Sequence, residues 1–491
     1  LRETLNSESA GGQAMSATVS VLIVYLGILA ALAVWSRRET HTLAGFYLAD
    51  KKLPFWVVAF STNATGESGW LLLGLSGMGY AVGAQAYWVV VGEIVGIALS
   101  WGLISRRLKK VGDETHSITV PDVLAAKFAD KWHLVRGIAV LIIVIMVTTY
   151  VTAQMVASGK AFSSFLGMKY ETGVIVGAIF IIGYTFVGGY KAVSYTDVVQ
   201  GVLMLLGLIA VPIAAVSAAG GWDAMTSTLA AEDPGLLDMF SFDSGPAWIG
   251  IASFVGIGLP FMGVPQLLVR YMSARDDGEI KKARIMSLIV LLVFTAGAVT
   301  AGVAGRALVP GLEDSETIFP RLSSDLFPPV IAGMLLVVVL SAIMSTVDSL
   351  LLLASSAVVR DTYQKIMGST ESDSVLSNYG KIITVVIGII ALVLGIQEPR
   401  VIFHFVLASW SGLGSAFGPV MIGILYYKRI TWLGVLCGML GGFLTSIIWL
   451  SFFKADYHGL YEAIPGFLAG MVLTFGVSWL TSQGKKTSAN L

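Results

Sequence analysis

The sequence predicts an all-α polytopic membrane protein, and three observations carry that prediction. Of the 491 residues, 56% are hydrophobic and only 13% are charged. The apolar residues gather in runs of about 20, which is the length that a helix needs to cross the hydrocarbon core of a bilayer. The polar segments between these runs are short, so we expect no large soluble domain.

Thirteen apolar runs are present, and each predicts one transmembrane helix. The first run has no small-residue cleavage site and is long enough to span, so we do not expect a cleaved signal peptide. Polar residues 1–16 are expected to form a disordered tail outside, and residues 483–491 a tail in the cytoplasm. The runs are 17–36, 54–80, 84–104, 134–159, 171–187, 195–217, 246–270, 283–306, 329–359, 378–396, 401–427, 431–452 and 460–481.

The basic residues predict the orientation of these spans. Cytoplasmic segments of membrane proteins are enriched in Lys and Arg. An outside N-terminus and a cytoplasmic C-terminus place most of the 31 lysines and arginines in the cytoplasm. The exceptions are Arg2, Lys160, Lys169, Arg306, Arg321, Arg400 and Lys454. A multi-pass protein of the plasma (inner) membrane, with the lipid bilayer as its surroundings, is therefore expected.

Two of the predicted spans contain residues that interrupt a helix. The second carries the polar stretch FSTNATGESGW at residues 60–70, and the seventh carries GIGLPFMGVP at residues 256–265. Pro260 and Pro265 each remove a backbone donor and clash with the preceding turn. One such interruption alone is more typical of a packing kink, but unwound backbone at membrane depth is tolerated where it lines an enclosed cavity.

The spacing of the two interruptions predicts an internal repeat. They fall five spans apart, in corresponding positions of spans 2–6 (residues 54–217) and spans 7–11 (residues 246–427). Because five is odd, the two repeats would be inverted relative to one another. Span 1 and spans 12–13 (residues 431–482) would lie outside the repeat. Paired breaks of this kind indicate a transporter with its binding site between them.

Ionisable residues inside spans are costly and usually functional. Four carboxylates qualify, namely Glu67, Glu93, Asp197 and Asp348. In the ninth span the hydroxyl groups and Asp348 fall on one helical stripe with no basic residue beside them, which suits a hard cation such as Na⁺. Serine stripes also serve ordinary helix packing. For Glu93, a role near the solute and a position facing a water-filled vestibule both stay open.

Other classes of site find no support. The single Cys excludes a disulfide framework, and the five His residues are scattered near span ends. There is no phosphate-binding loop and no metal-ligand spacing, so we do not expect an enzyme. The segment 218–245 is acidic, and it is either a cation-attracting vestibule or a solvated loop.

Several separated stretches resemble one known family. GYTFVGGYKAVSYTD at residues 183–197 is similar to the signature of sodium:solute symporters. The closest resemblance is to bacterial sodium/proline symporters, and it is nearly collinear from about residue 17 to 480. It is carried by SGW (68–70), PQLLVRYM (265–272), LSAIMSTVDSLLLLASSAVVRDTYQK (340–365), WSGLGSAFGPV (410–420) and GLYEAIPGF (459–467).

This resemblance implies a leucine-transporter-type fold with five-plus-five inverted repeats, and Na⁺ as the coupling ion. The implied sodium ligands are the carbonyls of Ala64, Glu67 and Ala342 and the hydroxyls of Ser345 and Thr346. A second sodium site, present in some relatives, maps onto Asp197, Ser345, Asp348 and Ser349. The implied solute-binding residues are Ser68, Gly69, Trp70, Tyr150, Ile257, Phe261 and Pro265.

Two departures from the proline symporters affect the expected solute. Those relatives carry an essential Asp where this chain has Gly66, with Glu67 at the next position. In the seventh span they carry Trp and Tyr where this chain has Ile257 and Phe261, and Gly in place of Pro260. These changes put proline itself in doubt as the solute.

The predicted function is sodium-coupled import of a small organic solute, proline or a related amino acid, by alternating access. The alternatives are another carboxylate or amino acid, or coupling to H⁺ through Glu67, Glu93 or Asp348. A solute sensor or a channel on the same fold is the alternative from another class. Neither a nucleic acid nor an obligate protein partner is expected.

Overall fold

The predicted all-helical membrane architecture is confirmed. The computed structural model describes residues 2–36, 42–128, 133–242, 245–397 and 402–487. Within these ranges ten helices are long and apolar enough to cross a membrane, or eleven if one bent pair counts as a single span. The bent pair is α12 (Ala247–Gly256), with the turn that follows it, and α13 (Pro265–Ser273), which meet at 46°.

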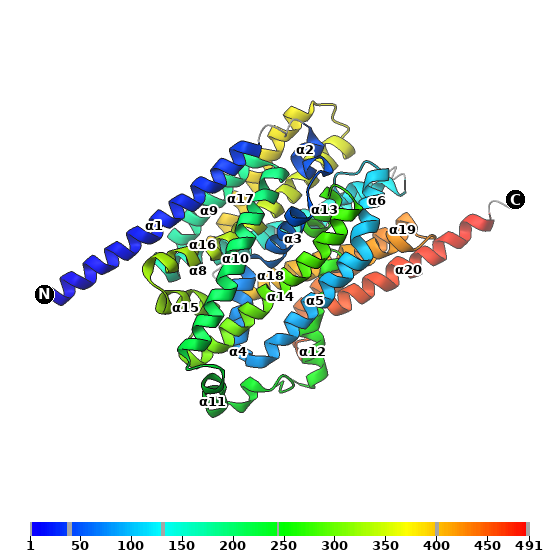
Figure 1. Cartoon of the computed structure of the whole chain (residues 1–491). Coiled ribbons are helices and arrows are strands. Elements are labelled where there is room, and N and C mark those ends of the chain that lie inside the picture. The colour runs from blue at the N-terminus through cyan, green and yellow to red at the C-terminus, as the bar shows by residue number, and fades with distance from the viewer. Residues whose placement is uncertain (1, 37–41, 129–132, 243–244, 398–401, 488–491) are drawn as a thin grey trace.

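Most predicted runs correspond to one continuous helix (Figure 1). The long helices are α1 (Arg2–Ser36), α8 (Leu134–Leu166), α9 (Tyr170–Gly188), α10 (Tyr190–Ala218), α14 (Asp277–Leu308), α16 (Pro329–Ser356), α17 (Asp373–Gln397), α18 (Ile402–Tyr426), α19 (Trp432–Ile448) and α20 (Ala463–Thr487). Shorter helices connect them outside the apolar runs, namely α2 (Leu43–Leu48), α7 (Val120–Ala126), α11 (Trp222–Glu232) and α15 (Ile318–Leu326).

One helical stretch of 60 residues, Phe55–Glu114, corresponds to two of the predicted runs. A straight helix of that length would extend about 90 Å, three times the thickness of the hydrocarbon core. The chain instead passes through α3 (Phe55–Gly69) and α4 (Ser76–Val82) and turns at residues 83–86. It then returns through α5 (Tyr87–Leu99) to α6 (Arg106–Glu114), as Figure 1 shows.

The helices at the two ends of the chain extend beyond the predicted spans. Helix α1 begins at Arg2, so residues 2–16 are helical in the structure. Extending an existing helix adds one hydrogen bond per residue and avoids the nucleation cost, and this polar segment directly precedes an apolar helix. At the other end α20 continues to Thr487, and residues 488–491 lie outside the described part of the chain.

Helix α16 lies at the centre of the bundle. Every side chain from Leu335 to Ser356 is buried, and α16 contacts α1, α3, α8 and α10. A helix that is buried on all sides belongs to the core of a large helical protein. Exposed apolar side chains are instead found on peripheral helices, such as Ile23 on α1, Ile289 on α14 and Val472 on α20. These surfaces suit contact with lipid.

The two interrupted helices are joined at one end. Leu53, just before α3, donates its backbone N–H to the carbonyl of Ser273 at 3.1 Å. Arg275, just after α13, donates to the carbonyl of Leu53 at 2.9 Å. The chain entering α3 is thus fixed to the chain leaving α13, and this holds the two interruptions in the same part of the protein.

Candidate ion and solute site

The predicted interruption of α3 is confirmed, but it is confined to one point. Residues 55–67 remain helical, and the backbone breaks at Ser68, with φ 31° and ψ −173°. A π-helical turn, Trp70–Leu75, follows. The polar residues before the break find partners without unwinding, because Thr62 donates to the carbonyl of Val58 at 2.6 Å and Asn63 donates to that of Ser287 at 2.8 Å.

Side chains of α3 itself and of α8 form hydrogen bonds around the break. The N–H of Gly69 donates to Oε1 of Gln154 on α8 at 2.9 Å. The Ser68 hydroxyl accepts the N–H of Trp70 at 3.1 Å and the phenol of Tyr150 at 3.2 Å. These bonds meet the requirement that backbone groups at membrane depth be paired within the protein.

The second interruption, between α12 and α13, is stabilised in the same way. A short 3-10 turn, Leu259–Met262, separates the two helices. Trp410 on α18 donates its indole N–H to the carbonyl of Ile257 at 3.0 Å. Ser100 donates to the carbonyl of Phe261 at 2.8 Å. The two prolines predicted this break, whereas the side chains that pair with it come from distant parts of the sequence.

Four of the five predicted sodium ligands lie together between α3 and α16. The Ser345 hydroxyl is 2.9 Å from the carbonyl oxygen of Ala64 and 3.2 Å from that of Ala342. The Thr346 hydroxyl is 3.5 Å from the Ala64 carbonyl and 3.1 Å from that of Thr65. The fifth, the carbonyl of Glu67, accepts the N–H of Trp70 beyond the break. This oxygen-rich cluster has the ligand chemistry of a hard cation.

The predicted second sodium site contains a residue that the sequence did not reveal there. The expectation that no basic residue lies beside this stripe is wrong, because Arg270 of α13 is buried among the predicted ligands. Its guanidinium lies 3.3 Å from Oδ2 of Asp197 and also donates to the Ser349 hydroxyl. It donates further to Thr65 at 2.6 Å and to Ser61 at 3.0 Å.

Arg270 was missed because it lies near the predicted end of the seventh span, among residues assigned to a cytoplasmic segment. The bend between α12 and α13 turns it inward instead. The two remaining members of the predicted set, Ser345 and Asp348, form hydrogen bonds with other groups. Ser345 bonds to the carbonyls of Ala64 and Ala342, and Asp348 accepts the Ser349 hydroxyl at 3.2 Å.

A small cavity of about 10 Å³ lies between the two interruptions. Three predicted solute-binding residues line it, namely Trp70, Tyr150 and Ile257. This volume holds no more than one water molecule, so an organic solute requires the lining side chains to move apart. The other lining residues are Gly66, Glu93, Val406, Leu407 and Trp410.

The remaining predicted solute-binding residues are not among those that line this cavity. Phe261 packs edge-on against Trp410, with 5.0 Å between the ring centroids. Pro265 begins α13 and is buried, but it does not line the cavity. Sequence reasoning missed the contribution of α18, although Trp410 lies in one of the family-like stretches.

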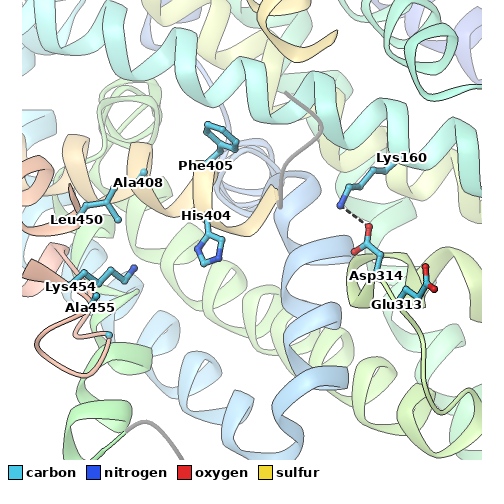
Figure 2. Close-up of a pocket in the computed structure, with 10 residues that line it drawn as sticks. Lys160, Glu313, Asp314, His404, Phe405, Ala408, Leu450, Lys454 and Ala455 are labelled. Carbon is cyan, nitrogen blue, oxygen red and sulfur yellow. Dashed lines mark hydrogen bonds and ion pairs between the residues drawn. The ribbon is translucent and has the colours of Figure 1, made fainter. Parts of the chain in front are cut away.

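A much larger cavity, of about 850 Å³, lies beyond the break at the ends of α8 and α18. Figure 2 shows His404 and Phe405 on one side of it and Lys160 with Asp314 on the other. Lys160 lies 2.8 Å from Asp314 and 2.6 Å from Glu316. The acidic segment 218–245 contributes to another cavity, of about 330 Å³, through Asp233.

Clusters of three or more His, Cys, Asp or Glu side chains that could hold a metal ion are absent from the described ranges. Clusters of these four residue types are typical of transition-metal sites. A sodium site can instead be built from carbonyl and hydroxyl oxygens, which Ala64, Ala342, Ser345 and Thr346 provide.

Comparison with known proteins identifies similar sequences and a similar fold. A profile of the sodium:solute symporter family matches residues 46–442. The chain is 37% identical over 455 residues to the high-affinity proline transporter PutP of Bacillus subtilis, covering 92% of this chain and 95% of that protein. It is 35% identical over 482 residues to the sodium/proline symporter of Staphylococcus aureus, with 95% and 93% covered.

Among solved structures, a Na⁺-coupled sialic acid symporter in a substrate-bound outward-open state has a TM-score of 0.78 at 19% identity, covering 94% of this chain and 98% of that chain. Mhp1, a nucleobase-cation-symport-1 family transporter, has a TM-score of 0.54 at 13% identity, covering 90% and 96%. At these identities the structures show a shared fold alone. The profile and the curated relatives go further: the chain belongs to the sodium:solute symporter family.

Proposed function

We propose that this protein imports proline by sodium-coupled secondary active transport, with alternating access to a site between the two interrupted helices. The observation that carries this proposal is the meeting of α3 and α16, where two hydroxyls approach carbonyls beside a helix break. The curated proline-transporting relatives support proline as the solute. One positive charge moving inward contributes about 2.3 kcal/mol per 100 mV of membrane potential.

We assign the coupling Na⁺ to Ala64, Glu67, Ala342, Ser345 and Thr346. The short distances among four of these groups, Ala64, Ala342, Ser345 and Thr346, support the assignment. To drive transport, the ion must bind one conformation more tightly than the other. A site between α3 and α16 meets that need if these helices change their separation during the cycle.

A second Na⁺ at Asp197, Ser345, Asp348 and Ser349 would have to share or displace the Arg270 guanidinium. That group already supplies a positive charge beside Asp197 at 3.3 Å. We therefore propose that transport requires one Na⁺ at the first site, with the second position held by Arg270 in this conformation.

The proposed solute pocket lies at Ser68, Gly69, Trp70, Tyr150, Ile257, Phe261 and Pro265. The contracted cavity of about 10 Å³ supports a closed conformation, in which the lining residues of α3, α5, α8 and α18 and Ile257 just after α12 must separate before proline enters. The large cavity in Figure 2 is then the outer vestibule that leads to it.

We further propose thirteen spans with inverted repeats at residues 54–217 and 246–427, followed by two spans within 431–482. Ten long apolar helices are present in the described ranges, and three features support three further spans. The stretch Phe55–Glu114 reverses direction and therefore counts as two spans. The shorter apolar helix α9 and the bent pair α12 and α13 add one span each. In Figure 1, α1 and α20 run in the same direction, as an odd number of spans requires. The proposed location is the plasma membrane, with the N-terminus outside and the cytoplasmic tail starting near residue 483.

The proposal is tested by uptake of radiolabelled proline into right-side-out membrane vesicles. An inward Na⁺ gradient should drive accumulation above equilibrium, and K⁺ in its place should not. Flux that never exceeds equilibrium would indicate a channel. Accumulation that persists without Na⁺ and collapses with a protonophore would assign the coupling to H⁺, for which Glu67, Glu93 and Asp348 are the candidates.

A further inference from the structure

The solute pocket contains a buried carboxylate that the residues around it leave unpaired. Glu93 lines the cavity between the two interruptions, and only 2% of its surface is exposed. Its Oε2 atom has no hydrogen-bond partner in the described part of the chain. Isolated charges inside proteins cost several kcal/mol unless they are paired, so such a group needs an explanation.

The position of Glu93 is fixed by the packing of its own helix. At the preceding residue, Gly92, a Cβ atom would lie 2.5 Å from backbone atoms of Val255 on α12. The backbone of α5 therefore lies directly against the interrupted helix, and only glycine permits this approach. This close packing places the Glu93 side chain beside the break.

The surroundings of Glu93 favour a positive charge. A second acidic side chain, Glu67, is also buried, and its Oε2 atom likewise has no partner among the described residues. None of the residues that line the cavity in the described structure is Lys, Arg or His. The aromatic residues Trp70, Tyr150 and Trp410 line the same cavity, and aromatic faces attract cations.

We propose that Glu93 is the counter-ion for a positively charged nitrogen on the transported solute, with the aromatic rings beside it. This deepens the proposed function, since proline carries a secondary ammonium group. The pocket should therefore bind small solutes with a positively charged nitrogen and exclude analogues whose nitrogen is acylated. Glu93 becomes a residue that determines specificity, separate from the predicted sodium ligands.

The test measures the shift in thermal unfolding temperature of the purified protein in saturating Na⁺. The probes are L-proline, its methyl ester, which keeps the ammonium and masks the carboxylate, and N-acetyl-L-proline, which masks the nitrogen. We expect proline and its ester to stabilise the wild type and N-acetyl-L-proline to give no shift. Glu93→Gln should weaken the apparent affinity for proline by about tenfold or more.

Two further variants separate binding from folding. Glu93→Asp keeps the charge and should recover part of the affinity that Glu93→Gln loses. Glu171→Gln removes a carboxylate from an exposed position on α9 and should bind proline like the wild type. Without solute, Glu93→Gln should unfold at a temperature equal to or above that of the wild type, because it removes a buried carboxyl group whose Oε2 atom has no partner among the described residues.

Equal affinity of Glu93→Gln and wild type for proline would overturn the inference, and so would tight binding of N-acetyl-L-proline. Glycine betaine and L-alanine are two further probes in the thermal-shift test, and both carry a positively charged nitrogen. The inference would also be overturned if no solute with such a nitrogen binds. Binding of any of them that depends on Glu93, without sodium-driven proline uptake, would overturn the proposed function and leave the inference standing.

Discussion

Ser68 adopts a backbone conformation that is unusual for a residue with a side chain. Its φ of 31° and ψ of −173° lie in a region occupied almost only by glycine, and such residues carry about 1–3 kcal/mol of strain. The hydroxyl compensates in part, because it bonds to the N–H of Trp70 and the phenol of Tyr150. This single residue creates the break beside which both candidate sites lie.

Substitutions at Ser68 should separate strain from hydrogen bonding. Ser68→Ala keeps the strain and loses both bonds, so we expect it to unfold at a lower temperature than the wild type. Ser68→Gly relieves the strain, and it should be more stable than Ser68→Ala by about 1 kcal/mol. Thermal unfolding of the two purified variants checks the order, and a less stable Ser68→Gly would contradict the strain argument.

At the scale of elements, α5 and the α12–α13 break form one packed unit. A Cβ atom at Gly96 would lie 1.9 Å from the carbonyl oxygen of Gly258, closer than any non-bonded contact allows. A contact between two backbones cannot be relieved by moving a flexible side chain. The position of the break therefore depends on α5 as much as on its own prolines.

Replacement of Gly96 by Ala should displace the break and abolish proline uptake. The matched control is Gly102→Ala, in the π-helical segment Ser100–Ser105 that continues α5, where a Cβ atom would meet nothing within 4 Å. Uptake in vesicles, normalised to the amount of folded protein, measures the effect. Normal uptake by Gly96→Ala would show that the close approach is not required.

A second unit joins α7, α8 and the end of the span that begins with α16. Arg136 on α8 lies 2.7 Å from Asp122 on α7 and also pairs with Asp361, while Arg360 lies 3.2 Å from Asp122. Burial alone would raise the pKa of Asp122, but Arg360 and Arg136 outweigh burial and hold the pKa below its ordinary value of 3.8.

This depressed pKa predicts how the stability depends on pH. A carboxylate whose pKa is lower in the folded state stabilises the fold above its unfolded pKa, and the contribution is lost as the pH falls through the folded value. Asp122→Asn should therefore destabilise the protein by about 3 kcal/mol at pH 7. The difference from wild type should shrink below about pH 4. Unfolding measured across this range checks both, and a difference that does not change with pH would refute the ion-pair account.

At the scale of the whole molecule, the proposed orientation places the cavity of Figure 2 outside and the Asp122 cluster inside. The chain contains one cysteine, Cys437, so a single substitution gives a background without thiols. In that background Ala455→Cys should react with a membrane-impermeant maleimide in right-side-out vesicles. His116→Cys should react only after the vesicles are opened, and the reverse pattern would invert the topology.

The sequence predicted the helices and the places where two of them break. Apolar length and the Gly and Pro residues are local properties, and packing did not override them. Arg270 in the predicted second sodium site could not be predicted, since its position depends on the bend between α12 and α13. The pairing of Ser68 with Tyr150 and the approach of Trp410 to Ile257 also join distant segments, so no local pattern contains them.

The most direct test of the central claim is proline-dependent uptake of radioactive ²²Na⁺ into proteoliposomes. The wild type should show Na⁺ entry that rises with proline. A Ser345→Ala and Thr346→Ala double variant should need a higher Na⁺ concentration for half-maximal entry. Ser323→Ala, whose hydroxyl bonds to the carbonyl of Phe319 within α15, is the control and should match the wild type. An unchanged Na⁺ dependence in the double variant would contradict the site between α3 and α16.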